Sequence, residues 1–170
     1  MKKLINLCVL LLVTCLATTL SAAPAFHDVT GELVKKNEEG SVITGVEGWL
    51  FFKEELVHIG AGSFWGEDAA AASRSKKKSF ADPLPAILEY NRLLAEKGIT
   101  LYLMPVPPKA LVYPDKLVEG VDRSAASEDH ALYQEFFGIL EKEGVKTIDM
   151  LPVLVANRDK ADVYCKTDTH

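Results

Sequence analysis

From Pro83 onward, helical and extended patterns alternate, and this order limits the possible folds more than any other feature of the chain. Apolar residues recur at helical spacing up to Gly98, and residues 99–106 then form a nearly continuous apolar strand pattern. A second helix is expected to begin at Ser127, its N-cap, and a second strand covers 145–150. Short glycine-containing links between such units favour a parallel sheet with helices on its faces. The sequence therefore predicts the α/β class, with a sheet buried on both sides.

The rest of the chain has fewer regular patterns. Residues 26–40 are polar without an apolar period, and we expect them to form a leader loop. Gly48–Phe52 is typical of a short strand whose aromatic side chains enter the core. Residues 60–80 contain several glycines and a solvent-facing lysine run, which indicates a long irregular connection with one helical turn. A short helix over 151–156 and an extended piece from Val163 complete the expected order.

Residues 1–23 have the layout of a secretory signal peptide. Lys2 and Lys3 precede an apolar run over 4–16, and the small residues Ser21-Ala22-Ala23 suit signal peptidase. The run is shorter than the roughly 20 apolar residues that span a membrane. We expect cleavage after Ala23, with Ala25 as the second candidate position, a domain over 24–170 and a periplasmic location. An uncleaved signal anchor, or a lipoprotein signal ending at Cys15, is the alternative.

The expected mature part carries 17 basic and 24 acidic residues, a net charge of −7. This balance argues against nucleic acid and anionic membrane surfaces as partners. An acidic polysaccharide would have to bind in a local basic groove. One cysteine, Cys165, remains after the signal. It either packs as a half-buried small side chain or pairs with a cysteine further along a longer chain.

Asp168 and His170 are the strongest candidates for catalysis. On an extended segment, residues two apart share a face. A carboxylate beside an imidazole can hold the Nδ1 proton and leave Nε2 free as a base. The pair would supply two members of a Ser-His-Asp triad, although exposed polar residues without a role are the default alternative.

Other chemistry has less support in the sequence. Zinc binding by the pair with another histidine lacks an HExxH or CxxC motif, so no metal or other cofactor is expected; the histidines concerned are His27, His58 and His130. No serine lies in a G-x-S-x-G context, and Ser63 is the nearest candidate but is expected to be a loop residue. Cys165 as a thiol nucleophile has no supporting motif.

Four short motifs occur in a fixed order along the mature part. They are Gly45–Phe52, Pro105–Pro114, Asp149–Pro152 and a last segment that runs from Val163-Tyr164 to Thr167–His170. In this order they resemble the SGNH-hydrolase-like family of periplasmic polysaccharide (alginate) O-acetyltransferases. The similarity extends from about Gly45 to the end of the sequence.

The resemblance implies an SGNH-hydrolase-like three-layer α/β/α sandwich with a mainly parallel sheet. In this family the Asp-x-His element precedes the catalytic serine, so Asp168 would orient His170, the general base. Family members continue beyond this histidine, so we expect an incomplete fold, truncated before its serine. The acetyl donor would be a membrane-bound acyltransferase partner, and the acceptor an exopolysaccharide such as alginate.

Two other functions remain open on the sequence. A carbohydrate acetylesterase would use the same pair to deliver the acetyl group to water. A non-catalytic module that binds polysaccharide or joins a secretion complex would need neither residue. Lys109, at a strand end within the second motif, is a candidate to bind a uronate carboxylate, with a structural role as the alternative.

Overall fold

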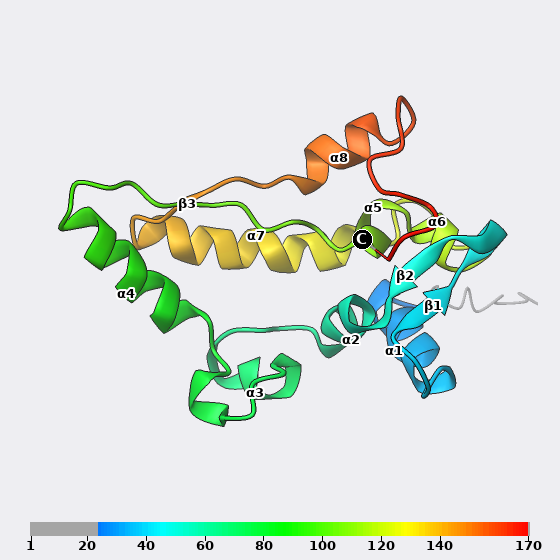
Figure 1. The fold of residues 1–170 in the computed structure, drawn as a ribbon, viewed down its shortest axis with the longest axis horizontal. Helices are drawn as coiled ribbons and strands as arrows, with labels where there is room; N and C mark the ends of the chain where they lie inside the picture. Colours follow the sequence, from blue (N-terminus) through cyan, green and yellow to red (C-terminus); the bar gives the residue numbers. More distant parts are fainter. Residues whose placement is uncertain (1–23, 170) are drawn as a thin grey trace, which may run out of the picture.

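The computed structural model describes residues 24–169, and it contains the expected helix–strand–helix–strand unit (Figure 1). Helix α4 (Leu84–Ala95) leads to strand β3 (Tyr102–Leu103), and helix α7 (Ser127–Lys142) leads to strand β4 (Lys146–Thr147). The two strands pair in parallel, Tyr102 opposite Lys146 and Leu103 opposite Thr147. The α/β class is therefore confirmed. Ser127 is the first residue of α7 and not its N-cap, which is Ala126.

The β3–β4 pair is covered on one face by helices. Buried side chains from the end of α7 and the following turn form a core with partly buried residues of α4 and β3; the buried members are Phe136, Phe137, Leu140 and Val145. Side chains alternate between faces along a strand. On the opposite face, Tyr102, Met104 and Val106 are 57%, 52% and 73% exposed. Burial on both faces is therefore not observed within residues 24–169.

The expectation of a leader loop over 26–40 is wrong, because residues Phe26–Lys36 form helix α1. Its buried face is small: Phe26 and Thr30 are buried, and the Thr30 hydroxyl donates to His27 O at 2.9 Å. The helix packs along α2 (Lys53–Ala61), where a Cβ on Gly60 would lie 3.3 Å from Gly31 Cα. Phe26, Leu33 and Val34 stand at helical spacing and pack in or against the core. The sequence therefore carried a helical pattern, which the polar residues between these positions obscured.

An antiparallel hairpin holds the aromatic motif. Strand β1 (Val42–Thr44) pairs with β2 (Leu50–Phe52) around the 3-10 turn η1 (Val46–Gly48). Glu47 and Gly48 both have positive φ, 54° and 79°. Phe51 is fully buried and Trp49 is 6% exposed, so the expected core role of these two side chains is confirmed.

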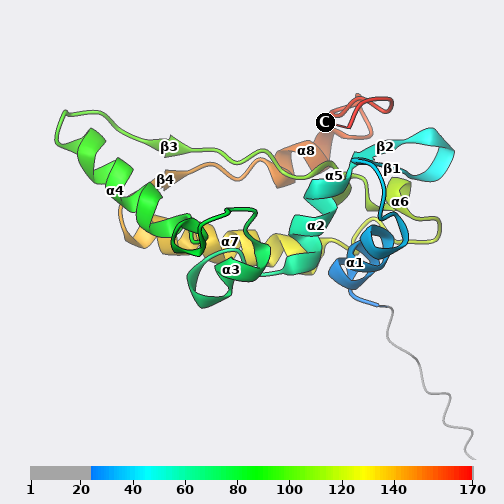
Figure 2. The same ribbon diagram turned by 60° about the horizontal axis from the view of Figure 1, so that its bottom comes forward.

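The connection over 60–80 is irregular, as expected, with one four-residue helix. It contains the turns η2 (Gly66–Asp68) and η3 (Lys78–Phe80) on either side of helix α3 (Ala69–Ala72), which Figure 2 shows below α7. Its lysine run is exposed. Phe64 and Trp65 pack on Phe136 of α7, with ring centroids 4.8 and 5.3 Å apart. Aromatic contacts therefore attach this connection to the second helix of the α/β unit.

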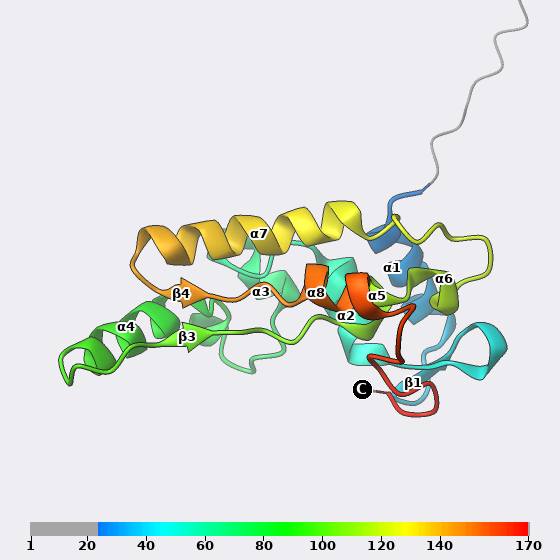
Figure 3. The ribbon, with the colours of Figure 1, turned by 90° about the horizontal axis from the view of Figure 1, so that it is seen from above.

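Three short helices complete the fold. Helices α5 (Lys109–Val112) and α6 (Pro114–Leu117) follow β3, and α8 (Leu151–Asn157) follows β4, close to the expected 151–156. After α8 the chain returns to the hairpin and ends beside it (Figure 3). No helix within residues 24–169 has the length and apolar character needed to cross a membrane. The predicted signal peptide over 1–23 lies outside the described residues.

Candidate functional site

Three of the four sequence motifs meet at one end of the molecule. Residues 163–169, called here the Asp168 loop, lie between the hairpin and the segment that precedes α5. The Leu50 N–H donates to Lys166 O at 2.9 Å, which attaches the loop to β2. The Tyr164 hydroxyl donates to Pro107 O, which attaches it to the second motif. The two segments that follow strand patterns in the sequence are therefore neighbours in space.

Lys109 lies at the centre of this junction and is fully buried. Its ammonium group donates hydrogen bonds to three main-chain carbonyls: Leu50 O at 2.8 Å, Asp168 O at 2.8 Å and Cys165 O. An ammonium group has three N–H donors. All three end on carbonyls of this chain, so the arrangement favours the structural role of Lys109 over contact with a uronate.

Aromatic rings form the wall around this ammonium. Its nitrogen is 5.1 Å from the Trp49 ring centroid and 5.4 Å from that of Phe51. Trp49 also packs on Tyr113, with centroids 4.6 Å apart. The Tyr113 hydroxyl accepts the Val163 N–H at 3.2 Å, at the start of the Asp168 loop. The first and second motifs thus form one aromatic box that holds both the lysine and the last motif.

The local sequence explains why Lys109 points inward. Pro107 and Pro108 fix an extended approach, and helix α5 begins directly after them. Glu55 of α2 accepts the Lys109 main-chain N–H at 3.2 Å, so one of the unpaired donors at the start of α5 is satisfied. The backbone is therefore held from α2 while the side chain extends toward β2.

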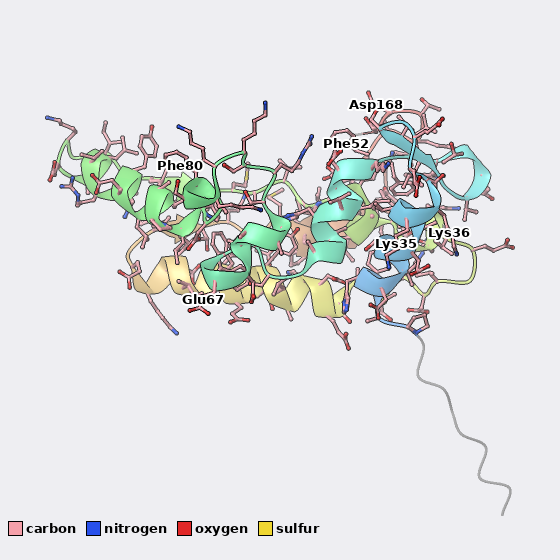
Figure 4. The ribbon with its side chains drawn as sticks, turned by 90° about the horizontal axis from the view of Figure 1, so that it is seen from below. Lys35, Lys36, Phe52, Glu67, Phe80 and Asp168 are labelled. Carbon is pink, nitrogen blue, oxygen red and sulfur yellow. The ribbon has the colours of Figure 1, made fainter. Side chains whose placement is uncertain are left out.

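Asp168 is exposed and lies in a bend, not in an extended strand. Its Oδ1 accepts the Thr169 N–H at 2.6 Å. Figure 4 shows Asp168 at the same end of the molecule as Phe52, the last residue of β2. His170 lies outside the described residues, so the predicted Asp168–His170 contact stays a prediction.

Three groups of the junction have shifted pKa values. Burial lowers the pKa of the Lys109 ammonium, while the charges of Cys165, Asp168 and Glu55 oppose that shift. Burial raises the pKa of Tyr164 to about 12, so its hydroxyl remains a donor at neutral pH. The hydrogen bond with the Thr167 hydroxyl lowers the pKa of the Cys165 thiol. Cys165 is exposed, so the half-buried packing expected as one alternative is not observed.

A mostly apolar groove of about 550 Å³ opens next to the junction. Phe52, Glu55 and Pro108 line it from the junction, and aromatic residues of the connection and of α7 line the rest: Phe64, Tyr133 and Phe136. His58 also lines the groove and packs on Phe64 with centroids 4.9 Å apart; burial lowers its pKa. The groove can accept an apolar group next to Phe52, Glu55 and Pro108, and no residue of the Asp168 loop (163–169) lines it.

The other sequence candidates have local roles. His130 Nε2 lies 2.7 Å from Asp149 Oδ2, which ties α7 to the third motif, and Asp149 Oδ1 accepts the Leu151 N–H at 3.1 Å. His27 contacts Asp129 between α1 and α7. The Ser63 hydroxyl donates to Trp65 O, as expected of a loop serine. Within residues 24–169, no three potential ligands cluster as a metal site requires.

Sequence reasoning missed Glu55 and the hydroxyl groups of Tyr113 and Tyr164. Both tyrosines stand in the recognised motifs, but nothing in their spacing shows that they bind main-chain atoms of another segment. Glu55 follows the first motif by three residues, and the only available signal was its place in the first turn of a helix.

Comparison with known proteins gives consistent matches. Residues 42–170 match the family model of the SGNH hydrolase-like domain of acetyltransferase AlgX. Three relatives are each named "Probable alginate O-acetylase AlgJ" and match over 129 residues, 76% of this chain. Identity is 30% for Pseudomonas aeruginosa PAO1, 31% for Pseudomonas syringae pv. tomato DC3000 and 30% for Azotobacter vinelandii.

The match covers 28% of the first relative and 29% of the other two. The chain thus spans less than a third of the length of these relatives. No solved structure matches the chain.

Proposed function

Because the chain belongs to the family of SGNH hydrolase-like acetyltransferases defined by the AlgX domain, we propose that it takes part in O-acetylation of an exopolysaccharide such as alginate. The observation that carries this proposal is the meeting of three sequence motifs around Lys109, with Asp168 presented at the surface beside them. In the proposal the reaction takes place in the periplasm, after export directed by residues 1–23.

The proposed chemistry gives Asp168 and His170 the roles that the family resemblance implies. Asp168 accepts a hydrogen bond from the Nδ1–H of His170 and orients the ring. His170 removes the proton of a serine hydroxyl as that oxygen attacks the acetyl carbonyl of the donor, then returns the proton to the leaving group. A sugar hydroxyl next gives its proton to His170 and attacks the acetyl-serine. The bond between the acetyl carbon and the serine oxygen breaks, and His170 returns the proton to that oxygen as the acetylated sugar leaves. We assign the nucleophile to none of the serines within residues 24–169.

The donor in this proposal is a membrane-bound acyltransferase partner. The acceptor is a hydroxyl group of the polysaccharide, and the alternative acceptor is water, which would make the protein an acetylesterase. Both reactions need the same base, so the site alone does not separate them. The groove lined by Phe52, Glu55 and Pro108 supports an acyl-transfer site, because it offers an apolar surface within the junction that also holds the Asp168 loop.

Deleting the gene in its source organism tests the proposal, because a transferase and an esterase change the acetylation of the secreted polysaccharide in opposite directions. The acetyl ester content of the secreted polysaccharide, measured per sugar residue, falls if the protein is part of the transferase. It rises if the protein is an esterase. A constant acetyl content together with less secreted polymer would contradict both enzymatic readings and favour a binding or secretion module.

A further inference from the structure

The three N–H donors of the Lys109 ammonium bind two separate parts of the chain. One donor binds Leu50 O of β2, and two bind carbonyls of the Asp168 loop, at Cys165 and at Asp168 itself. The ammonium therefore fixes the distance between a strand of the core and the main chain of the candidate catalytic carboxylate.

A buried lysine is costly and needs a compensating interaction. Burial lowers the pKa of this ammonium, and the nearby acidic groups oppose that shift. Three carbonyl dipoles and the faces of Trp49 and Phe51 surround the charge. An apolar side chain of similar length, such as methionine, would fill the same space at lower desolvation cost. The charge is therefore best explained by the carbonyl groups that it holds.

Packing does little to fix the Asp168 side chain, because this residue is exposed in a bend. Its Oδ1 accepts the N–H of the following residue, Thr169, at 2.6 Å, so the path of the backbone contributes to the position of the carboxylate. Lys109 binds the Asp168 carbonyl directly, and the Leu50–Lys166 hydrogen bond holds the chain two residues earlier. A shift of about 1 Å in a catalytic group is enough to lower a rate greatly.

We propose that Lys109 is a positioning residue, whose ammonium holds the Asp168 main chain where the carboxylate can orient His170. This inference rests on the proposed function, because it assigns Lys109 a role through the Asp168–His170 pair. It replaces uronate binding as the reason for a lysine at this position.

The test is the pKa of the His170 imidazole, measured by NMR titration of the purified protein, with the signal assigned from the spectrum of His170→Gln. Three variants are compared with the wild type: Asp168→Asn, Lys109→Met and Lys53→Met. Lys53 is the matched control, because its ammonium also donates to a main-chain carbonyl, that of Glu38, but at an exposed site.

We expect Asp168→Asn to lower the His170 pKa, because a neighbouring carboxylate stabilises the charged ring. Lys109→Met should move the His170 pKa most of the way to the Asp168→Asn value, and Lys53→Met should leave it at the wild-type value. A wild-type pKa in Lys109→Met, with a lowered one in Asp168→Asn, would overturn the positioning role alone. An unchanged pKa in Asp168→Asn would instead contradict the proposed pair.

Lys109→Met leaves three carbonyls without their donor, so folding of this variant is checked by circular dichroism. If it does not fold, the wild-type protein provides the test through its reaction with acetic anhydride, followed by peptide mass spectrometry. If the Lys109 ammonium is held by its three carbonyls, Lys109 reacts with the anhydride at least tenfold more slowly than the exposed lysines at 76–78. Equal reaction rates would show that the Lys109 ammonium is accessible to the reagent, and this result would overturn the inference.

Discussion

Asp129 Oδ1 lies 3.9 Å from His27 Nδ1, and this contact joins the first turn of α7 to the N-terminal helix α1. The Asp129 side chain is 7% exposed, and its Oδ2 is buried with no hydrogen-bond partner among the described residues. His27 is 44% exposed, so the interaction across this contact is largely screened by water. The carboxylate thus loses more stabilisation from water on folding than it gains from the contact with His27, and burial raises the pKa of Asp129.

Asp129→Asn should raise the free energy of unfolding at pH 7 by about 1 kcal/mol. The folded state holds the Asp129 proton to a higher pH than the unfolded chain, so the ionised carboxylate destabilises the fold at neutral pH. The gain should shrink as pH falls toward the ordinary value of 3.8. Urea unfolding at several pH values measures this, with the exposed neighbour Glu128→Gln as control. A loss of stability at pH 7 would mean that the contact with His27 dominates.

Gly45→Ala should destabilise the protein by about 2 kcal/mol or more, because a Cβ at this position would lie 2.3 Å from Lys116 O and 2.8 Å from the Phe51 ring. Gly138→Ala in α7 is the matched control. A Cβ there meets nothing within 4 Å, and alanine favours a helix, so we expect a gain of about 1 kcal/mol. Thermal unfolding of both variants measures the difference, and equal effects would contradict the close packing of η1 against α6.

Tyr164→Phe should lower the free energy of unfolding by about 1–2 kcal/mol, because it removes the hydrogen bond from the Tyr164 hydroxyl to Pro107 O that attaches the Asp168 loop to the second motif. Tyr90→Phe, on the exposed side of α4, should change stability by less than about 0.5 kcal/mol. Chemical unfolding measures both. If the two substitutions have the same small effect, the Tyr164 hydroxyl contributes nothing to anchoring the loop.

Cys165 should react with iodoacetamide in the folded protein nearly as fast as in denaturant, because its thiol is exposed and the hydrogen bond with Thr167 lowers its pKa. Mass spectrometry of the peptide that contains Cys165 measures the rate. Cys165→Ser should leave stability within about 0.5 kcal/mol of wild type, since Lys109 binds the carbonyl and not the sulfur. Strong protection from labelling would contradict the exposed position.

The sequence predicted the parts of this fold that depend on local patterns. The α4–β3 and α7–β4 units follow from apolar spacing and glycine stops, and the irregular connection over 60–80 follows from its composition. Helix α1 was missed although Phe26, Leu33 and Val34, which pack in or against the core, recur at helical spacing. The many polar residues between these positions obscured the apolar stripe.

The sequence singled out Lys109 and Asp168 as candidates, but it did not predict the geometry that joins them. The Lys109 ammonium binds the main-chain carbonyls of Leu50, Cys165 and Asp168. Carbonyl groups are the same in every residue, so the sequence holds no record of which ones a lysine will bind. The shape of residues 163–169, a bend rather than an extended strand, was missed for the same reason.

The most direct measurement of the central claim is the acetyl content of the secreted polysaccharide after single-residue replacement in the source gene. Asp168→Ala and His170→Ala should each lower acetylation by tenfold or more, about as far as deleting the gene. Asp162→Ala, an exposed carboxylate in the chain just before the Asp168 loop, should leave it unchanged. Wild-type acetylation in both the Asp168→Ala and His170→Ala strains would contradict the proposed catalytic pair.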